Sequence, residues 1–220
     1  MLIYKTVLNK KKYENTIKKS VFISRIKRVY TEDEAIGFID EVKSENRGAN
    51  HNCYAYILGD KSMIQRYSDD GEPQATAGIP ILEVLKKENL TNVCVVVTRF
   101  FGGVKLGASG LIRAYTDGCS GLIKISQVVE VRDYYVVKCF LDYSFVGKFD
   151  NWISNSLFYE IGRNYEKIIS INLYVDVDLY ENFSEEINNL TSGQVKFEIL
   201  EKNLLFVKNG RIRGGKYVRT

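Results

Sequence analysis

The feature that most constrains this chain is a glycine-rich loop that joins an apolar run to a helix-like segment. The run, residues 93–97, reads Val-Cys-Val-Val-Val, and because it does not alternate with polar residues it predicts a strand covered on both faces. The loop and the start of the expected helix, residues 99–110, read Arg-Phe-Phe-Gly-Gly-Val-Lys-Leu-Gly-Ala-Ser-Gly. Glycines at such a junction let the backbone approach a ligand closely, and the N–H groups at a helix start attract anions. The loop is therefore the first candidate for a binding site.

Composition limits the class of protein. Of the 220 residues, 45% are hydrophobic and 26% are charged, which is typical of a soluble globular protein with one large or two small domains. The sequence has no apolar run of membrane-spanning length, and residues 1–5 lack the apolar stretch of a secretion signal. The four cysteines have no paired spacing, which favours buried thiols over a disulfide or a zinc site. We therefore expect a cytoplasmic protein with no membrane partner.

Apolar periodicity predicts the elements of the first half of the chain. Thr31 is expected to cap a helix, because Glu34 completes a capping box and an apolar stripe follows. Pro80 fits the first turn of a second helix, where its missing N–H costs little. The expected strands lie within 13–26, over 52–58, near Tyr67 and over 93–98, and the second and third helices lie over about 77–88 and about 108–123.

The pattern after residue 133 predicts a ferredoxin-like unit. Strands and amphipathic helices follow one another there in the order βαββαβ. We therefore divide the chain into an N-terminal domain (1–132), a ferredoxin-like domain (133–201) and a basic tail (202–220). The segments expected in the ferredoxin-like domain are 134–141, 143–157, a strand near Ile161, 168–178, 180–190 and 195–200.

Basic residues are concentrated at the two ends of the chain. Residues 1–30 contain nine Lys or Arg and one Glu, and residues 202–220 contain six Lys or Arg and no acidic residue. Such ends favour a polyanionic partner, although on charge alone ordinary surface variation is the simpler explanation. Residues 211–216, Arg-Ile-Arg-Gly-Gly-Lys, are expected to be either a flexible cationic segment that contacts phosphate or a disordered terminus.

Five separate motifs resemble those of one known family. In chain order they are Lys-Ser-Val-Phe-Ile at 19–23, Ala-Asn-His-Asn-Cys at 49–53, Ser-Asp-Asp-Gly-Glu-Pro at 68–73, Thr-Ala-Gly-Ile-Pro at 76–80, and Arg-Phe-Phe-Gly-Gly at 99–103 with Leu106-Gly107. Through these motifs the chain, over roughly residues 15–200, resembles the IMPACT family and, within it, the bacterial YigZ branch.

The resemblance implies an α+β fold. The N-terminal domain would be a two-layer α/β domain like the second domain of a small-subunit ribosomal protein, with an uncommon left-handed crossover. The ferredoxin-like βαββαβ domain would resemble the fifth domain of elongation factor G. The eukaryotic relative is a translation regulator, and the bacterial members are suspected of binding nucleic acid or ribosomes, so the resemblance implies RNA, a ribosome or a translation-regulatory protein as the partner.

The residues expected to bind nucleic acid or phosphate lie in and after the loop. Cationic side chains would supply charge, and free backbone N–H groups near the helix start would hold a phosphate. One of two adjacent phenylalanines would stack on a base while the other packs inward, and Phe100 is the ring assigned to the site. The loop matches neither a P-loop nor a dinucleotide fingerprint, and its glycines alternatively serve only a tight turn and close packing. The full set is Arg99, Phe100, Gly102, Gly103, Lys105, Gly107, Ser109 and Arg113.

Three carboxylates and the sole histidine form a supporting motif. Asp69, Asp70 and Glu72 stand beside Gly and Pro in a context typical of a turn, so we expect no catalytic or metal-binding role for them. One of these carboxylates is expected to pair with Arg99 and fix its direction. His51 lacks the partners of a metal or general-base site and is expected to pack or form hydrogen bonds near the loop. No catalytic residue, metal or cofactor is predicted.

Three functions are compatible with the sequence. The leading hypothesis is a non-enzymatic protein that binds RNA, a ribosome or a translation regulator. The second is an enzyme acting on a small phosphorylated metabolite, which rests only on an analogy of fold. The third is a protein-interaction module with an exposed apolar patch at Phe145, Phe149 and Trp152.

Overall fold

The chain divides into two compact units. The structure, a computed structural model, describes residues 1–217. The first unit is Tyr4–Glu130, and the second combines Met1–Ile3 with the chain from Val131 onward. Strand β1 (Leu2–Val7), which the sequence analysis did not anticipate, pairs with β7 (Val128–Leu141).

The first unit is built on a five-stranded sheet in the order β2-β3-β6-β4-β5, and each neighbouring pair is antiparallel. Its central strand contains the apolar run at 93–97, and residues 93–99 of that strand are buried. The bounds are β2 Lys11–Ile17, β3 Ser20–Arg28, β4 His51–Leu58, β5 Ile64–Ser68 and β6 Val93–Phe100.

The single strand expected within residues 13–26 is two strands joined by a tight turn. Lys18 and Lys19 make that turn with φ of 45° and 68°. Left-handed backbone at two lysines is uncommon, and neither Gly nor Asn marked the position in the sequence. The prediction therefore missed a hairpin whose turn chemistry is atypical.

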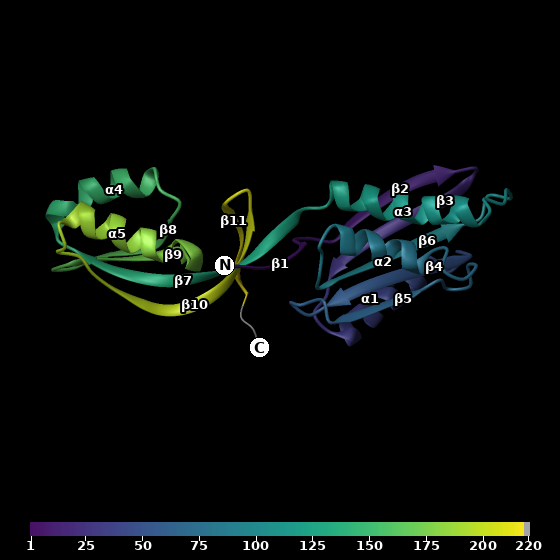
Figure 1. Cartoon of the computed structure of the whole chain (residues 1–220), viewed down its shortest axis with the longest axis horizontal. Helices are drawn as coiled ribbons and strands as arrows, with labels where there is room; N and C mark the ends of the chain where they lie inside the picture. The colour runs from purple at the N-terminus through teal and green to yellow at the C-terminus, as the bar shows by residue number, and fades with distance from the viewer. Residues whose placement is uncertain (218–220) are drawn as a thin grey trace. The chain divides into compact units, whose positions relative to one another are not determined.

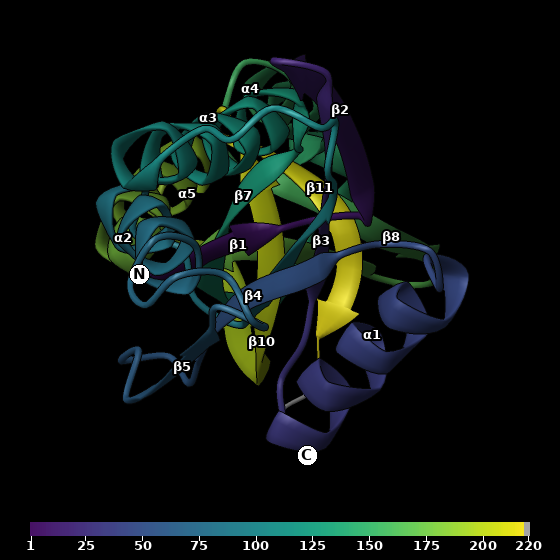
Figure 2. The same ribbon diagram turned by 90° about the vertical axis from the view of Figure 1, so that its right-hand side faces the viewer.

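Helices cover both faces of this sheet (Figures 1 and 2). Successive side chains of β6 point to opposite faces of the sheet. Val95 and Val97 pack with α2 (Gly78–Lys87) and α3 (Ala108–Ile125) on one face. Cys94 and Val96 pack with α1 (Glu32–Glu45) on the other. Helix α1 thus adds a layer to the α/β layers that were expected. Its expected N-cap is confirmed, because the hydroxyl of Thr31 accepts a hydrogen bond from the backbone N–H of Glu34 at 3.1 Å.

The second unit has the predicted ferredoxin-like arrangement. Its strands lie in the order β11-β10-β7-β9-β8, so the four strands of the βαββαβ pattern run fourth, first, third, second across the sheet. Both helices lie on one face of this sheet (Figure 1). The remaining bounds are α4 Val146–Ser154, β8 Tyr159–Tyr165, β9 Ile169–Asp176, α5 Tyr180–Thr191, β10 Lys196–Lys208 and β11 Arg211–Tyr217.

The predicted basic tail, residues 202–220, needs correction, because most of it belongs to the sheet. Strand β10 continues to Lys208 and pairs antiparallel with β11, so residues 211–216 lie in a hairpin strand, and residues 218–220 lie outside the described part of the chain. Asn209 and Gly210 form the turn with φ of 51° and 70°, as a two-residue hairpin turn requires. The side chains of Leu205 and Val207 pack with Tyr134 in a small core. The Asn-Gly dipeptide was the signal that could have revealed this hairpin.

No helix within residues 1–217 is long and apolar enough to cross a membrane. All four cysteines are buried free thiols, as expected.

Candidate functional site

A cavity of about 460 Å³ lies in the first unit where β6 ends and α3 begins. The loop between these elements forms one wall, and the start of β4 and the turn after β5 form the others. The lining residues are Asn50, His51, Glu72, Pro73, Arg99, Phe101, Lys105, Leu106, Gly107, Ala108 and Leu111. The cavity therefore brings together parts of three motifs that are far apart in the sequence.

The N-terminus of α3 opens at this cavity. Gly107 is the N-cap residue at φ +74° and has no side chain to cap the helix, no other side chain within residues 1–217 caps it, and its first turn contains no acidic residue. The N–H groups of Ala108, Ser109 and Gly110 therefore have no acceptor within the helix, and they carry the positive end of the helix dipole. Gly107 and Ala108 themselves line the cavity. This end of the helix is suited to an anionic group.

Arg99 is held inside the cavity wall by a buried hydrogen-bond network. Its Nη1 donates to Oε1 of Glu72 at 2.7 Å, and the hydroxyl of Tyr115 donates to the same oxygen at 2.8 Å. Burial raises the pKa of the Tyr115 phenol, so this hydroxyl keeps its proton and remains a donor. The expected pairing of a turn carboxylate with Arg99 is confirmed, and Glu72 is the partner.

Two aromatic rings flank the Arg99 guanidinium. Its central carbon lies 5.5 Å from the ring centroids of both Phe22 and Phe101. The residue is only 5% exposed, and its Nε has no hydrogen-bond partner among the residues that the structure describes. A buried donor without an acceptor is costly, so this atom favours a ligand acceptor in the cavity that Arg99 lines.

The other two carboxylates of the turn are used by the fold. Asp69 accepts hydrogen bonds from the backbone N–H groups of Ala75, Ala77 and Gly78, at 2.8, 3.0 and 2.8 Å, and so caps the start of α2. Asp70 forms an ion pair with Lys43 and accepts from the backbone N–H of Asn52. Among the described residues, no group of three or more His, Cys, Asp or Glu could hold a metal ion.

His51 lies between these acidic residues and the cavity. Its Nδ1 is 2.9 Å from the carbonyl oxygen of Asp70, and its Nε2 is 3.9 Å from Oε2 of Glu72. The side chain is 24% exposed and lines the cavity. It forms the hydrogen bond near the loop that was expected of it.

The assignment of Phe100 to the site needs correction. Adjacent strand residues point to opposite faces, and Arg99 faces the α3 side, so Phe100 faces the α1 side and does not line the cavity. Phe101, the first residue after the strand, lines the cavity and is 46% exposed. Phe101 is therefore the ring available to a ligand.

The other glycines and polar residues of the predicted site have different roles. A side chain at Gly102 would place its Cβ 2.0 Å from the carbonyl carbon of Lys19, so this glycine serves close packing against the β2–β3 turn. Gly103, at φ +82°, supports the turn of the loop. Ser109 and Arg113 are exposed on α3 beyond the cavity lining.

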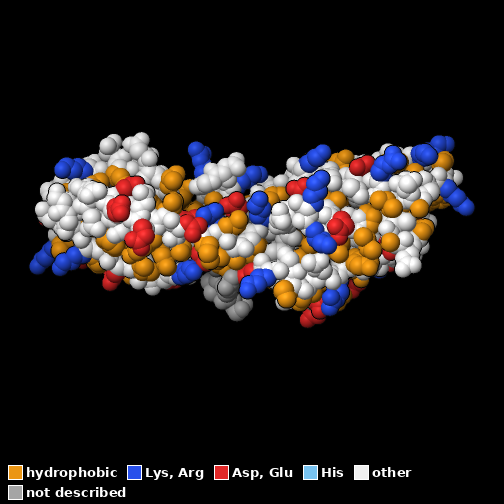
Figure 3. All heavy atoms as spheres, in the orientation of Figure 1, with side chains coloured by type: hydrophobic (Ala, Val, Ile, Leu, Met, Phe, Trp, Pro, Cys, Tyr) orange, Lys and Arg blue, Asp and Glu red, His pale blue; other side chains and the backbone are white. Residues whose placement is uncertain are grey.

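Close packing at Gly102 brings a basic hairpin turn beside the loop. The backbone N–H of Gly102 also donates to the hydroxyl of Ser20 at 3.1 Å. Lys18, Lys19 and Lys105 are all exposed. Lys and Arg side chains are frequent at the end of the first unit where the β2–β3 turn and this loop lie (Figures 1 and 3). Exposed lysine side chains thus lie near the N-terminus of α3.

Two residues that the sequence reasoning did not assign to the site also shape it. Asn50 closes the loop, because its side-chain oxygen accepts from the N–H of Phe101 at 2.8 Å and its own N–H donates to the carbonyl of Arg99 at 3.0 Å. Tyr115 is the second donor to Glu72. Its position four residues after Leu111, on the buried face of α3, was the available signal.

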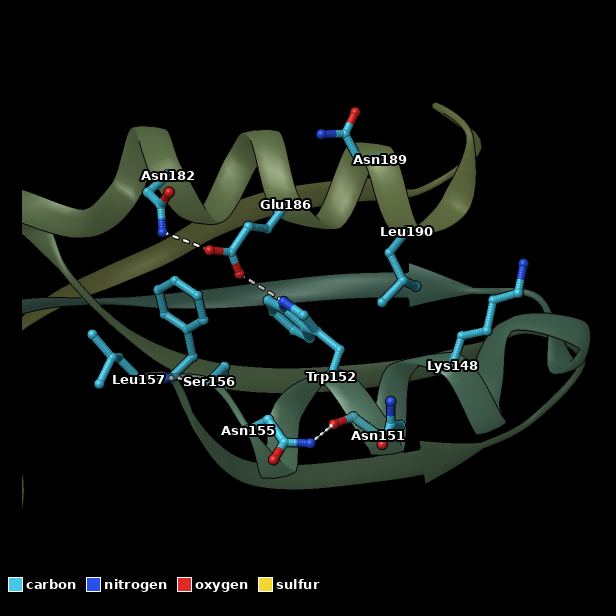
Figure 4. Close-up of a pocket in the computed structure, with 11 residues that line it drawn as sticks. Lys148, Asn151, Trp152, Asn155, Ser156, Leu157, Asn182, Glu186, Asn189 and Leu190 are labelled. Atoms are coloured by element: carbon cyan, nitrogen blue, oxygen red, sulfur yellow. Dashed lines mark hydrogen bonds between the residues drawn. The ribbon is translucent and has the colours of Figure 1, made fainter.

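A larger cavity of about 660 Å³ lies in the second unit, between α4 and α5 (Figure 4). Glu186 is its central charge, and both of its oxygens are satisfied at 2.7 Å, one by Nε1 of Trp152 and one by Nδ2 of Asn182. Phe149 is fully buried, and Phe145 and Trp152 pack against the same core. The apolar patch expected of a protein-interaction module is therefore not formed by these rings.

Two family models match the two halves of the chain. Residues 18–123 match the Impact N-terminal domain, and residues 139–194 match a domain of unknown function, DUF1949. The IMPACT family member YvyE of Bacillus subtilis is 42% identical over 93% of this chain and 94% of its own length. The IMPACT family member YigZ of Escherichia coli is 28% identical over 84% of this chain and 92% of its own length.

A solved structure has the same fold. It is described as a crystal structure of a hypothetical protein, and it covers 91% of this chain and 98% of its own length with a TM-score of 0.57 at 24% identity. The mixed α+β class expected from the sequence is confirmed by this likeness together with the two family matches.

Proposed function

This chain belongs to the IMPACT family, and from that premise we propose that it binds single-stranded nucleic acid at the start of α3, in a role connected with translation regulation. The role in translation comes from the family resemblance. The binding mode comes from the first unit, where the cavity joins an open helix end to cationic and aromatic side chains.

The observation that carries the proposal is the uncapped start of an 18-residue helix in a cavity lined by Arg99 and Lys105. The helix N–H groups and Lys105 would contact a phosphate, as anions bind at helix N-termini. Phe101 offers an exposed ring on which an unpaired base can stack, a contact that contributes about 1–3 kcal/mol per base. Lys18 and Lys19 would extend the contact along the phosphate backbone.

The test compares two substitutions that each remove one positive charge, one just before the start of α3 and one in its last turn. Lys105→Ala removes a cation beside the start of α3, and Lys124→Ala removes an exposed cation from its last turn, about 24 Å from the first residue of the helix at 1.5 Å per residue. Binding of a fluorescent 12-nucleotide single strand is measured by anisotropy at several salt concentrations.

Lys105→Ala should weaken binding by about three- to tenfold, the effect of one charged contact at an exposed site. It should also make the negative slope of log affinity against log salt less steep by about 0.7, the value for one phosphate contact on a single strand. Lys124→Ala should leave both quantities unchanged. Equal effects of the two substitutions, or no binding by the wild-type protein, would reject the proposed function.

A further inference from the structure

Two polar side-chain atoms lie close together at the cavity before α3. They are Nε2 of His51 and Oε2 of Glu72, and they lie 3.9 Å apart. This separation is too long for a direct hydrogen bond. The space between them is therefore suited to a ligand group that hydrogen-bonds to both.

The hydrogen bond on the far side of the His51 ring determines the role of Nε2. Nδ1 lies 2.9 Å from the carbonyl oxygen of Asp70, and a carbonyl oxygen can only accept. Nδ1 must therefore carry the hydrogen and donate it. In the neutral imidazole, Nε2 is then the acceptor.

Glu72 reaches the cavity with one oxygen already occupied. Its Oε1 accepts from both Arg99 and Tyr115, whereas Oε2 makes no hydrogen bond to any residue in the described part of the chain. The side chain is only 3% exposed. Oε2 is therefore free to accept a hydrogen bond from a ligand in the cavity that Glu72 lines.

We infer that this acceptor pair takes the 2′-hydroxyl of a ribose, so that the cavity selects RNA over DNA. The hydroxyl has one hydrogen, which it shares between the two acceptors, and a deoxyribose has no donor at that position. Phosphate oxygens cannot replace it, because phosphate only accepts. The inference rests on the proposed function, since the phosphate held at the start of α3 would bring the attached ribose to His51 and Glu72, which line the same cavity.

The test compares three strands that differ only in the sugar. A 12-nucleotide sequence of adenine and cytosine alone has identical bases in RNA, DNA and 2′-O-methyl RNA, and the last keeps the oxygen but lacks the hydroxyl hydrogen. Affinities for the full chain are measured by anisotropy at one salt concentration. Loss of one hydrogen bond to a charged group should make RNA bind about tenfold or more tightly than either of the other strands.

His51→Ala provides the matched protein change. It should lower the RNA-to-DNA affinity ratio, because Glu72 alone remains as an acceptor, whereas Lys124→Ala should keep the wild-type ratio; circular dichroism checks that both variants are folded. Because the wild-type protein is compared across three ligands, the test does not depend on how well any variant folds.

The outcomes separate the two proposals. Equal affinities for all three strands, each weakened by Lys105→Ala, would reject selection of ribose and leave nucleic-acid binding at α3 intact. An RNA preference that persists unchanged in His51→Ala would place the discrimination elsewhere and also reject the inference. Absence of binding to every strand would reject the proposed function itself.

Discussion

Arg99 combines a conspicuous charge with an almost fully buried position. In the sequence it is a cation at the edge of a glycine-rich loop, which favours a phosphate contact. In the structure its guanidinium donates to Glu72 and lies between two aromatic rings. Its main role is thus to hold the cavity wall, and the exposed Lys105 is the cation better placed to meet a ligand.

Substitution of Arg99 should therefore act mainly on the free energy of unfolding and less on ligand affinity. Arg99→Ala leaves the buried Glu72 carboxylate without its ion pair, and breaking such a pair from one side costs about 3–5 kcal/mol. Urea unfolding followed by far-UV circular dichroism measures this loss. The double variant Arg99→Met/Glu72→Met removes both charges and should recover much of the lost stability. A single variant within about 1 kcal/mol of the wild type would show that the pair is not structural.

The sequence was sufficient to find these residues but not to assign each its role. The pairing of Arg99 with a turn carboxylate followed from charge and spacing. The choice between Phe100 and Phe101 depended on which residue ends the strand, and strand ends are the least certain part of any pattern. The separation of Asp69, Asp70 and Glu72 into a helix cap, an ion pair and a cavity residue required the folded turn.

At the scale of elements, the cavity depends on how the loop after β6 is held against the β2–β3 turn. Gly102 has no space for a side chain, because a Cβ would lie 2.0 Å from the backbone of Lys19. Gly103 has open space and only an unusual φ of +82°. Gly102 is therefore required for close packing, whereas Gly103 is required for its backbone conformation.

Gly102→Ala should be the more damaging substitution. The added methyl must push the β2–β3 turn and the loop apart, whereas Gly103→Ala should cost only about 1–2 kcal/mol for a left-handed alanine. Thermal unfolding compares the two variants, and nucleic-acid affinity measured on the folded protein shows whether the cavity is disturbed. Equal destabilisation by the two substitutions would contradict the packing role of Gly102.

Strong local signals predicted most helices and strands, and tertiary pairing explains what was missed. The Thr31 cap, the apolar β6 run and the βαββαβ pattern all predicted elements that the structure contains. The β2–β3 turn uses two lysines in left-handed backbone, which propensity does not favour. Strand β10 was predicted too short because its basic composition concealed the buried Leu204–Val207 segment.

At the scale of the whole molecule, both units rely on apolar cores that include the cysteines. All four thiols are buried, and burial raises the pKa of each, to about 12 for Cys139. Since the thiolate is the reactive form, buried neutral thiols should be unreactive.

A thiol-specific colour reagent at pH 8 tests the packing of both units at once. The folded protein should show no reaction within minutes, and all four thiols should react in denaturant. Fast reaction of even one thiol in the folded protein would show that its core is open.

The division into two units and the class of the second could be predicted from the order of elements, and the class of the first from the family resemblance, whereas the functional surface could not. The sequence predicted that the loop binds an anion, but the cavity also needs the start of β4, the turn after β5 and the β2–β3 hairpin. These segments meet only through the pairing of β4 and β3 with β6. Long-range strand register therefore determines the site, and no local pattern encodes it.

The central claim is that the open start of α3 holds a phosphate of a bound nucleic acid. The most direct measurement is a titration of the ¹⁵N-labelled protein with a short single-stranded RNA, followed through backbone amide signals. The account predicts that the amides of Ala108, Ser109 and Gly110 shift most, together with the side-chain signals of His51, the sole histidine. Shifts confined to other surfaces, with these three amides unchanged at saturation, would contradict it.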